Sequence, residues 1–184
     1  MLTKLHIFIK HKMKAKVYRS VSNWPRDIVF KLDYLQDLLL QTVMFLAEKQ
    51  AFDLKHFKNT SLEISVKYVA DHEMKQFNGT YRQQDKPTNV LSFPIADYKK
   101  QLANLSPNVT KKQIYLGDIV FSYQKIRSEA EEQDKTIQDH VTHLFVHSVF
   151  HLIGFDHIKK DDQVEMEALE VEFLDSIGIH NIYD

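Results

Sequence analysis

The sequence predicts a single α+β domain, in which one mixed sheet of about four strands packs with about five to six helices. A length of 184 residues suits one domain with one sizeable core. Short segments that alternate apolar and polar residues, as strands do, are mixed with longer segments whose apolar residues recur at helical spacing. The order of these segments, β-α-β-α-β-β-α-α-α, is typical of an α+β domain with one sheet.

In the first half of the chain the pattern changes several times. Residues 15–21 predict a short strand, and residues 27–50 predict a long helix with Pro25 near its start. Residues 62–70, LEISVKYVA, alternate as a half-buried strand does. We expect Asp71 to be the N-cap of a short helix that ends near Gly79.

The second half is mostly helical. Residues 88–95 predict a strand ended by Pro94, residues 97–113 a loop, and residues 113–122 a further strand. Helices are expected at 123–134, 136–153 and 160–177. Residues 1–14 are interpreted as an N-terminal extension that precedes the domain of residues 15–184, and Met13 offers an alternative start.

Composition narrows the classes of protein. The absence of cysteine excludes disulfides and thiolate metal sites, which fits a reducing compartment. No stretch approaches the roughly 20 apolar residues of a membrane span, and the N-terminus lacks a signal-peptide pattern. We therefore expect a cytoplasmic protein without a membrane partner.

Charge is distributed unevenly. After Lys160 there are eight acidic residues and no Lys or Arg, whereas residues 1–160 hold 24 basic and 17 acidic residues. A positive body allows a polyanionic partner, although a solvated surface explains the charge equally well. The acids of residues 161–175 are expected to form a solvated helix face rather than a second metal site.

Four histidines occupy one side of the helix predicted at 136–153. At 100° per residue His140, His143, His147 and His151 lie within about 80° of one another, and most of the remaining circumference is apolar. A helix that is apolar nearly all round is buried, and buried imidazoles need hydrogen-bond partners or a ligand.

The spacing of three histidines predicts a metal site. His147 and His151 are four residues apart, Gly154 can end the helix in a left-handed conformation, and His157 then returns toward the pair. Three neutral histidines leave a tetrahedral Zn²⁺ with one open position, as catalytic sites do. One zinc ion is favoured, and nickel, copper and iron remain alternatives. His140 and His143 are interpreted as cavity-lining or surface residues.

The same spacing occurs in metzincin peptidases, where a glutamate follows the first histidine as general base. Here that residue is Ser148, which cannot accept a proton near neutral pH. The pattern therefore favours a reaction that needs the metal as a Lewis acid and source of hydroxide, such as phosphodiester cleavage.

Four segments, at residues 147–157, 81–94, 115–122 and 165–174, match the motifs of one known family. Together they resemble the YbeY family of metal-dependent endoribonucleases that mature ribosomal RNA. HSVFHLIGFDH (147–157) resembles its HGxLHLxGYDH signature, and YRQQDKPTNVLSFP (81–94) its YRxxDKPTDVLSFP segment. YLGDIVFS (115–122) and EMEALEVEFL (165–174) are similar to its LGDIV strand and acidic last helix. The departures, among them Ser148 for glycine and Asn89 for the commoner aspartate, remove no ligand.

The resemblance implies roles for particular residues. His147, His151 and His157 would bind zinc, and Arg82 would face the metal cleft and take part in cleavage, where a guanidinium suits a phosphate. Asp156 and Asp118 are each either hydrogen-bond partners of a ligand or turn residues. Lys86, Asn89 and Ser92 either line the cleft or form a turn.

The implied function is single-strand-specific cleavage of RNA in the maturation of the small-subunit ribosomal RNA 3′ end and in ribosome quality control. The expected partners are that RNA, the small ribosomal subunit and ribosome-associated proteins. Two alternatives are a ribosome-assembly factor whose zinc is mainly structural and a zinc peptidase, which the missing glutamate disfavours.

Overall fold

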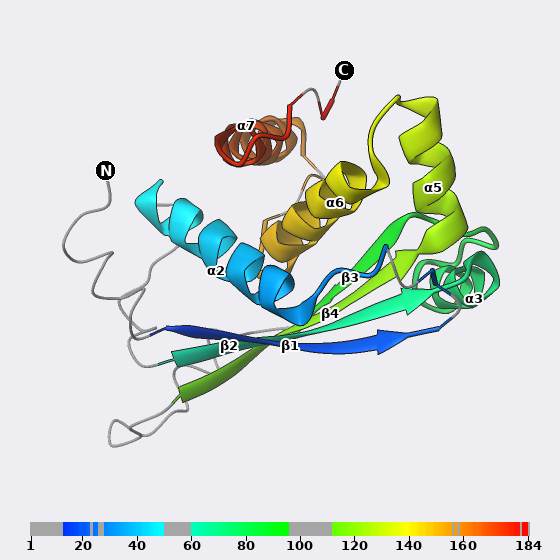
Figure 1. The fold of residues 1–184 in the computed structure, drawn as a ribbon, viewed down its shortest axis with the longest axis horizontal. Helices are drawn as coiled ribbons and strands as arrows, with labels where there is room; N and C mark the ends of the chain where they lie inside the picture. Colours follow the sequence, from blue (N-terminus) through cyan, green and yellow to red (C-terminus); the bar gives the residue numbers. More distant parts are fainter. Residues whose placement is uncertain are drawn as a thin grey trace.

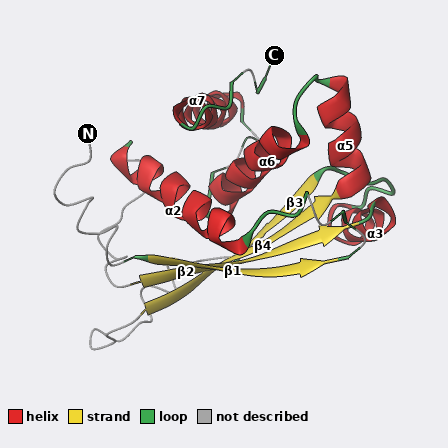
Figure 2. Cartoon of the chain, viewed as in Figure 1, coloured by secondary structure: helices red, strands yellow, loops and turns green. Residues whose placement is uncertain are grey.

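The computed structural model describes residues 13–22, 24–25, 28–49, 60–95, 112–155, 157, 159–180 and 182–183. Four strands and five helices lie in these ranges (Figures 1 and 2). They are β1 (Lys14–Val21), α2 (Leu32–Glu48), β2 (Thr60–Val69), α3 (Asp71–Arg82), β3 (Val90–Pro94), β4 (Lys112–Ser122), α5 (Tyr123–Glu132), α6 (Ile137–Leu152) and α7 (Lys160–Ser176). The predicted α+β domain with one four-stranded sheet is confirmed. Most of the expected extension at residues 1–14, and the loop expected between β3 and β4, lie outside the described residues.

The strands form one mixed sheet in the order β1-β2-β4-β3. β1 pairs parallel to β2, and β2 parallel to β4, whereas β3 pairs antiparallel to β4 at the sheet edge. The burial of β2 alternates along its length, with Leu62, Ile64 and Val66 buried and the residues between them half-buried. This alternation gives the sheet an inner face, which carries the main core, and an outer face.

Two helices, α2 and α6, pack against the inner face, and α7 lies over them as a further layer (Figure 1). α6 is buried on nearly every side, as its apolar circumference predicts. On the outer face α3 covers only a second, smaller cluster formed by Val69, Met74, Leu91 and Val120. None of the described helices is both long and apolar enough to cross a membrane.

A bulge in β4 brings α6 close to the sheet. The register between β2 and β4 shifts after Glu63, so that Ile64 lies opposite Gly117. Gly117 has φ +143°, and a Cβ placed there would lie 2.2 Å from the carbonyl oxygen of Phe93 and 2.9 Å from Leu152 Cδ2. Only glycine allows β3, β4 and the end of α6 to meet at this point.

Two helix boundaries differ from the prediction by three residues or more. The helix expected from residue 27 begins at Leu32, because Trp24 is buried against the sheet and donates its indole N–H to the carbonyl of Val69 over 2.7 Å. The helix expected to end near Gly79 continues to Arg82, and Gln83 then adopts a left-handed conformation with φ 57°.

Asp71 was expected to be the N-cap of α3, but the structure places Ala70 there. Asp71 is the first residue of α3, and its Oδ1 accepts a hydrogen bond from the backbone N–H of Lys125, 3.1 Å away, in the first turn of α5. Ser122, the N-cap of α5, donates its hydroxyl to the same oxygen. The carboxylate therefore stabilises the following helix by satisfying donors at its N-terminus.

Candidate metal centre

Three histidines converge where α6 ends. His147 and His151 occupy adjacent turns of the helix, and Gly154, with the predicted positive φ of +103°, reverses the chain so that His157 returns. One ring nitrogen from each of His147, His151 and His157 lies within 4.8 Å of the other two. The predicted cluster is therefore formed, and its nitrogens are close enough to reach a single ion.

Hydrogen bonds orient the two helical imidazoles. Nδ1 of His147 lies 2.9 Å from a carboxylate oxygen of Glu170, and Nδ1 of His151 lies 3.0 Å from the carbonyl oxygen of Phe155. Both partners are acceptors, so in the neutral rings each Nδ1 carries the proton and donates it. The two Nε2 atoms then point their lone pairs toward each other, 3.1 Å apart. A pair of lone pairs held this close fits a bound cation, and imidazole donors suit Zn²⁺.

Glu170 corrects the expectation that the acids of the last helix are solvated. Its side chain is completely buried, and beside His147 it is contacted by the hydroxyl of Tyr183, which donates to Oε2, and by Nε2 of His143 at 3.6 Å. Burial alone would raise the pKa of Glu170, but its bonds with His143 and His147 outweigh this and lower the pKa to about 2. The carboxylate is thus ionised behind the histidine cluster, where a cation would be stabilised.

The sequence carries a signal for this burial. Met166, Phe173 and Leu174 form the buried stripe of α7, and Glu170 lies four residues after the first and three before the second. An acid on the apolar stripe of a helix is distinguishable from the acids around it. Tyr183 carries no comparable signal, because its contact depends on where the chain runs after α7.

Burial favours the neutral form of two imidazoles, those of His151 and His143. Burial, followed by the charge of His147, lowers the pKa of His151 to about 4. Burial also lowers the pKa of His143, although Glu170 opposes the shift. Metal ligation requires an unprotonated imidazole, so His151 is in the ligating form near neutral pH.

The other two histidines of the stripe are buried and have acidic partners. His143 adjoins Glu170, and Nε2 of His140 lies 3.0 Å from Oε2 of Glu129 on α5. Asn89 donates to the same oxygen of Glu129 over 2.9 Å, and its own Oδ1 accepts from the N–H of Val90. Asn89 therefore links the start of β3 to α5 and α6.

The remaining predicted site residues are more widely spread. Arg82 is exposed at the end of α3, over the outer face, and none of its contacts within the described chain joins it to the histidines. Asp118 is exposed on the outer face and accepts from the Tyr115 hydroxyl over 2.7 Å. Ser92 is half-buried on β3, and register places it on the inner face with Ile119.

Two further candidates remain. Lys86 is exposed, and its carbonyl accepts from the side chain of Asn78 over 2.7 Å, which supports its interpretation as a turn residue. Asp156 lies outside the described residues.

Comparison with known proteins decides the family. The family model described as "Endoribonuclease YbeY" matches residues 21–178, which is most of the chain and includes the histidine cluster. This chain belongs to the YbeY family. The resemblance inferred from its four sequence segments is thereby confirmed.

Relatives in the YbeY family cover most of the chain. A protein of Allorhizobium ampelinum named Endoribonuclease YbeY is 36% identical over 172 residues, which are 94% of this chain and 95% of that protein. One of Francisella philomiragia with the same name is 35% identical and covers 80% of this chain and 85% of its own length. One of Erythrobacter litoralis is 43% identical over 66% of this chain and 74% of its own length.

A solved structure supports the fold. The solution structure of TM1509 from Thermotoga maritima matches with a TM-score of 0.54 at 21% identity, covering 88% of this chain and 89% of that one. The similarity therefore covers most of the fold.

Proposed function

We propose that this chain is a zinc-dependent endoribonuclease that cleaves single-stranded RNA in ribosomal RNA maturation. The observation that carries the proposal is the pair of Nε2 atoms of His147 and His151, 3.1 Å apart, each freed for a metal by an acceptor on its Nδ1. His157 would supply the third ligand. The family match supports the endoribonuclease activity.

The chain's own residues limit what chemistry the site can perform. When bound, a zinc ion would supply the positive charge that polarises a phosphodiester. Ser148, which occupies the position of the peptidase glutamate, is fully buried, and its hydroxyl donates to the carbonyl of Leu144 over 2.8 Å. It can neither reach solvent nor accept a proton, which disfavours a peptidase mechanism. Glu170 is equally buried, and it orients His147 instead of acting as a base.

Arg82 is the proposed phosphate partner. It is exposed, and its planar guanidinium offers several N–H donors to a phosphate, so it can approach a polyanion that passes over the sheet edge. We further propose that Ser92, which lies on the inner face of the edge strand, lines the path from that edge toward the histidines. The proposed substrate is the 3′ end of the small-subunit ribosomal RNA in the cytoplasm, with ribosome-associated proteins as partners.

Cleavage of a labelled single-stranded RNA and of the matching duplex by the purified protein tests this function. We expect cleavage of the single strand only, its loss in His147→Ala and Arg82→Ala, and its retention in His72→Ala, which changes an exposed histidine on α3. Metal analysis of the same preparation should give one zinc per chain. Undiminished cleavage by both His147→Ala and Arg82→Ala would identify a contaminating nuclease and refute the proposal.

Metal removal separates catalysis from a purely structural role. The main core lies between the sheet, α2, α6 and α7 and does not depend on the three histidines. We therefore expect the metal-free protein to keep its circular dichroism spectrum while losing cleavage, and zinc to restore it. A metal-free protein that remains folded and still cleaves RNA would exclude a catalytic ion.

A further inference from the structure

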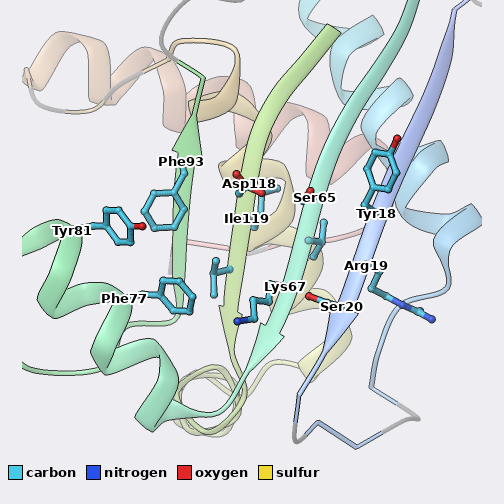
Figure 3. A pocket seen from close by; sticks show the side chains of 12 residues that line it. Tyr18, Arg19, Ser20, Ser65, Lys67, Phe77, Tyr81, Phe93, Asp118 and Ile119 are labelled. Carbon is cyan, nitrogen blue, oxygen red and sulfur yellow. The ribbon is translucent and has the colours of Figure 1, made fainter. Parts of the chain in front are cut away.

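The outer face of the sheet holds a groove that the proposed chemistry does not use. We define the outer-face groove by six of its lining residues, Tyr18, Ser65, Lys67, Tyr81, Phe93 and Asp118 (Figure 3). Its volume is about 580 Å³. α3 forms one wall, and β1, β2, β4 and β3 form the floor (Figure 3).

Strand register arranges the floor as a row. Tyr18 pairs with Ser65, Ser65 with Asp118, and Asp118 with Phe93, so that one residue from each strand lies on a line across the sheet. With neighbouring strands about 4.8 Å apart, the row spans roughly 14 Å. An aromatic ring stands at each end, and polar side chains occupy the middle.

The aromatic end at α3 is held rigidly. The rings of Tyr81 and Phe93 meet edge to face with centroids 4.9 Å apart, and Phe77 stacks beside Tyr81. Phe77 and Phe93 also pack on the small apolar cluster beneath α3. Tyr81 is nevertheless 63% exposed, so a large preorganised ring surface faces solvent. Tyr18, at the opposite end, is 43% exposed.

Cations accompany both ends of the row. Nζ of Lys67 lies 5.0 Å from the centre of the Phe77 ring, and Nζ of Lys16 lies 4.5 Å from that of Tyr18. The nearby acids are Glu73, 3.9 Å from Lys67, Glu63, which accepts from the Tyr18 hydroxyl, and Asp118 in the middle of the row. Rings that can stack on bases, with cations beside them for phosphates, are the features of single-strand nucleic-acid platforms.

The position of the groove disfavours a peptide. An extended peptide that joins a sheet pairs with an unpaired strand edge, whereas this groove lies on the face, over β2 and β4, whose edges are already paired. Asp118, exposed in the middle of the row, offers a carboxylate to the exocyclic amino groups of bases. A polar floor between exposed rings therefore fits nucleobases better than apolar side chains.

We propose that the outer-face groove binds a short single-stranded segment of the RNA substrate, with bases stacked on Tyr81 and Tyr18 and phosphates near Lys67. This proposal rests on the proposed endoribonuclease function and adds the surface that selects single strands. Arg82 directly follows Tyr81, so RNA held in the groove passes the proposed phosphate partner. β3, the strand of the groove next to α3, is the edge of the sheet. On the opposite, inner face of this edge strand lies α6.

Binding measured apart from cleavage tests the groove. Fluorescence anisotropy of a labelled 2′-O-methyl RNA with the zinc-loaded full chain reports affinity, and a denaturing gel run on the same sample verifies that the strand is still intact. Each of Tyr81→Ser and Tyr18→Ser should weaken binding by about 5- to 100-fold, since stacking on one ring contributes that much. Tyr81→Phe should bind as the wild type does, because it keeps the ring.

Two further variants sharpen the test. Tyr34→Ser removes a comparably exposed tyrosine from α2 on the inner side and should leave affinity unchanged. Lys67→Gln should lower the dependence of log affinity on log salt concentration by about 0.7, as expected for the loss of one phosphate contact in a single strand.

The outcomes distinguish the two proposals. If Tyr81→Ser and Tyr18→Ser bind RNA as tightly as the wild type while His147→Ala abolishes cleavage, the groove serves another partner and the groove proposal is wrong, although the function stands. If the wild type neither binds nor cleaves single-stranded RNA, both proposals are wrong. Equal loss of binding in Tyr34→Ser would also overturn the assignment, since the effect would not be local.

Discussion

Replacing Glu170 with glutamine should weaken zinc binding while leaving the fold intact. The carboxylate accepts from Nδ1 of His147 at 2.9 Å and from the Tyr183 hydroxyl, and it is completely buried. Glutamine keeps the volume but replaces one oxygen with an NH₂ group, which must face a donor or turn away from His147. Either arrangement removes the negative charge behind the ligand, and an NH₂ group that faces Nδ1 also removes the acceptor that orients His147.

The expected loss of zinc affinity follows from the effect of a hydrogen-bond partner on a metal-ligating histidine. Removing the hydrogen-bond partner of a metal-ligating histidine typically lowers metal affinity 10- to 100-fold. This corresponds to about 1.4 to 2.7 kcal/mol. Competition with a chromogenic chelator gives the zinc dissociation constant, and near-ultraviolet circular dichroism reports whether the core is still packed. Glu165→Gln, which changes an exposed acid on the same helix, is the matched control.

An unchanged dissociation constant in Glu170→Gln would show that the carboxylate does not position His147 for a metal. An equal loss in Glu165→Gln would show that the charge of α7 as a whole, rather than the buried contact, sets the affinity. Either result would refute the reasoning, even if RNA cleavage also declined.

Three smaller changes test other contacts. Tyr183→Phe should reduce zinc affinity by less than Glu170→Gln, because it removes one of the bonds to the carboxylate but leaves its charge, and the same chelator competition measures it. Gly117→Ala should lower the free energy of unfolding in urea by more than about 2 kcal/mol, since its φ is positive and its Cβ would clash. Gly79→Ala lies inside a helix, where a Cβ would make only an ordinary contact of 3.9 Å with the carbonyl oxygen of Gln84, so it should raise that free energy by about 0.5 kcal/mol. Asn89→Asp places a carboxylate against Glu129, so the free energy of unfolding in urea should fall by about 1 to 3 kcal/mol at pH 7. The repulsion raises the folded-state pKa of the two carboxyl groups. The loss of stability should therefore disappear as the pH falls toward 4 and the groups become protonated.

Much of the fold follows from periodicity in the sequence. The alternation of residues 62–70 predicts a half-buried strand, and the apolar circumference of residues 137–153 predicts a buried helix, because burial selects residue type directly. The boundaries near Trp24 and Asp71 could not be predicted in the same way. Each depends on a partner far along the chain, the carbonyl of Val69 in one case and the first turn of α5 in the other.

The proposed metal ligands could be predicted for a related reason. His147, His151 and Gly154 belong to one helix and its end, so local geometry alone brings their side chains and the following turn together. The groups that orient those ligands are not local. Glu170 lies 23 residues further along the chain than His147. Its place on the buried stripe distinguishes it from the other six acids of α7, but its contact with His147 depends on how α7 packs.

The histidine cluster and the carboxylate that orients it come together at different stages of folding. The three histidines can meet once α6 and its turn have formed, but Nδ1 of His147 gains its acceptor only after α7 has packed over α6. The C-terminal segment completes the arrangement, since Lys135 donates to the carbonyl of Ile182 over 2.8 Å and so fixes the chain beside Tyr183. Tight metal binding therefore requires the packed last helix, and a chain that ends before α7 should bind zinc weakly even where α6 is helical.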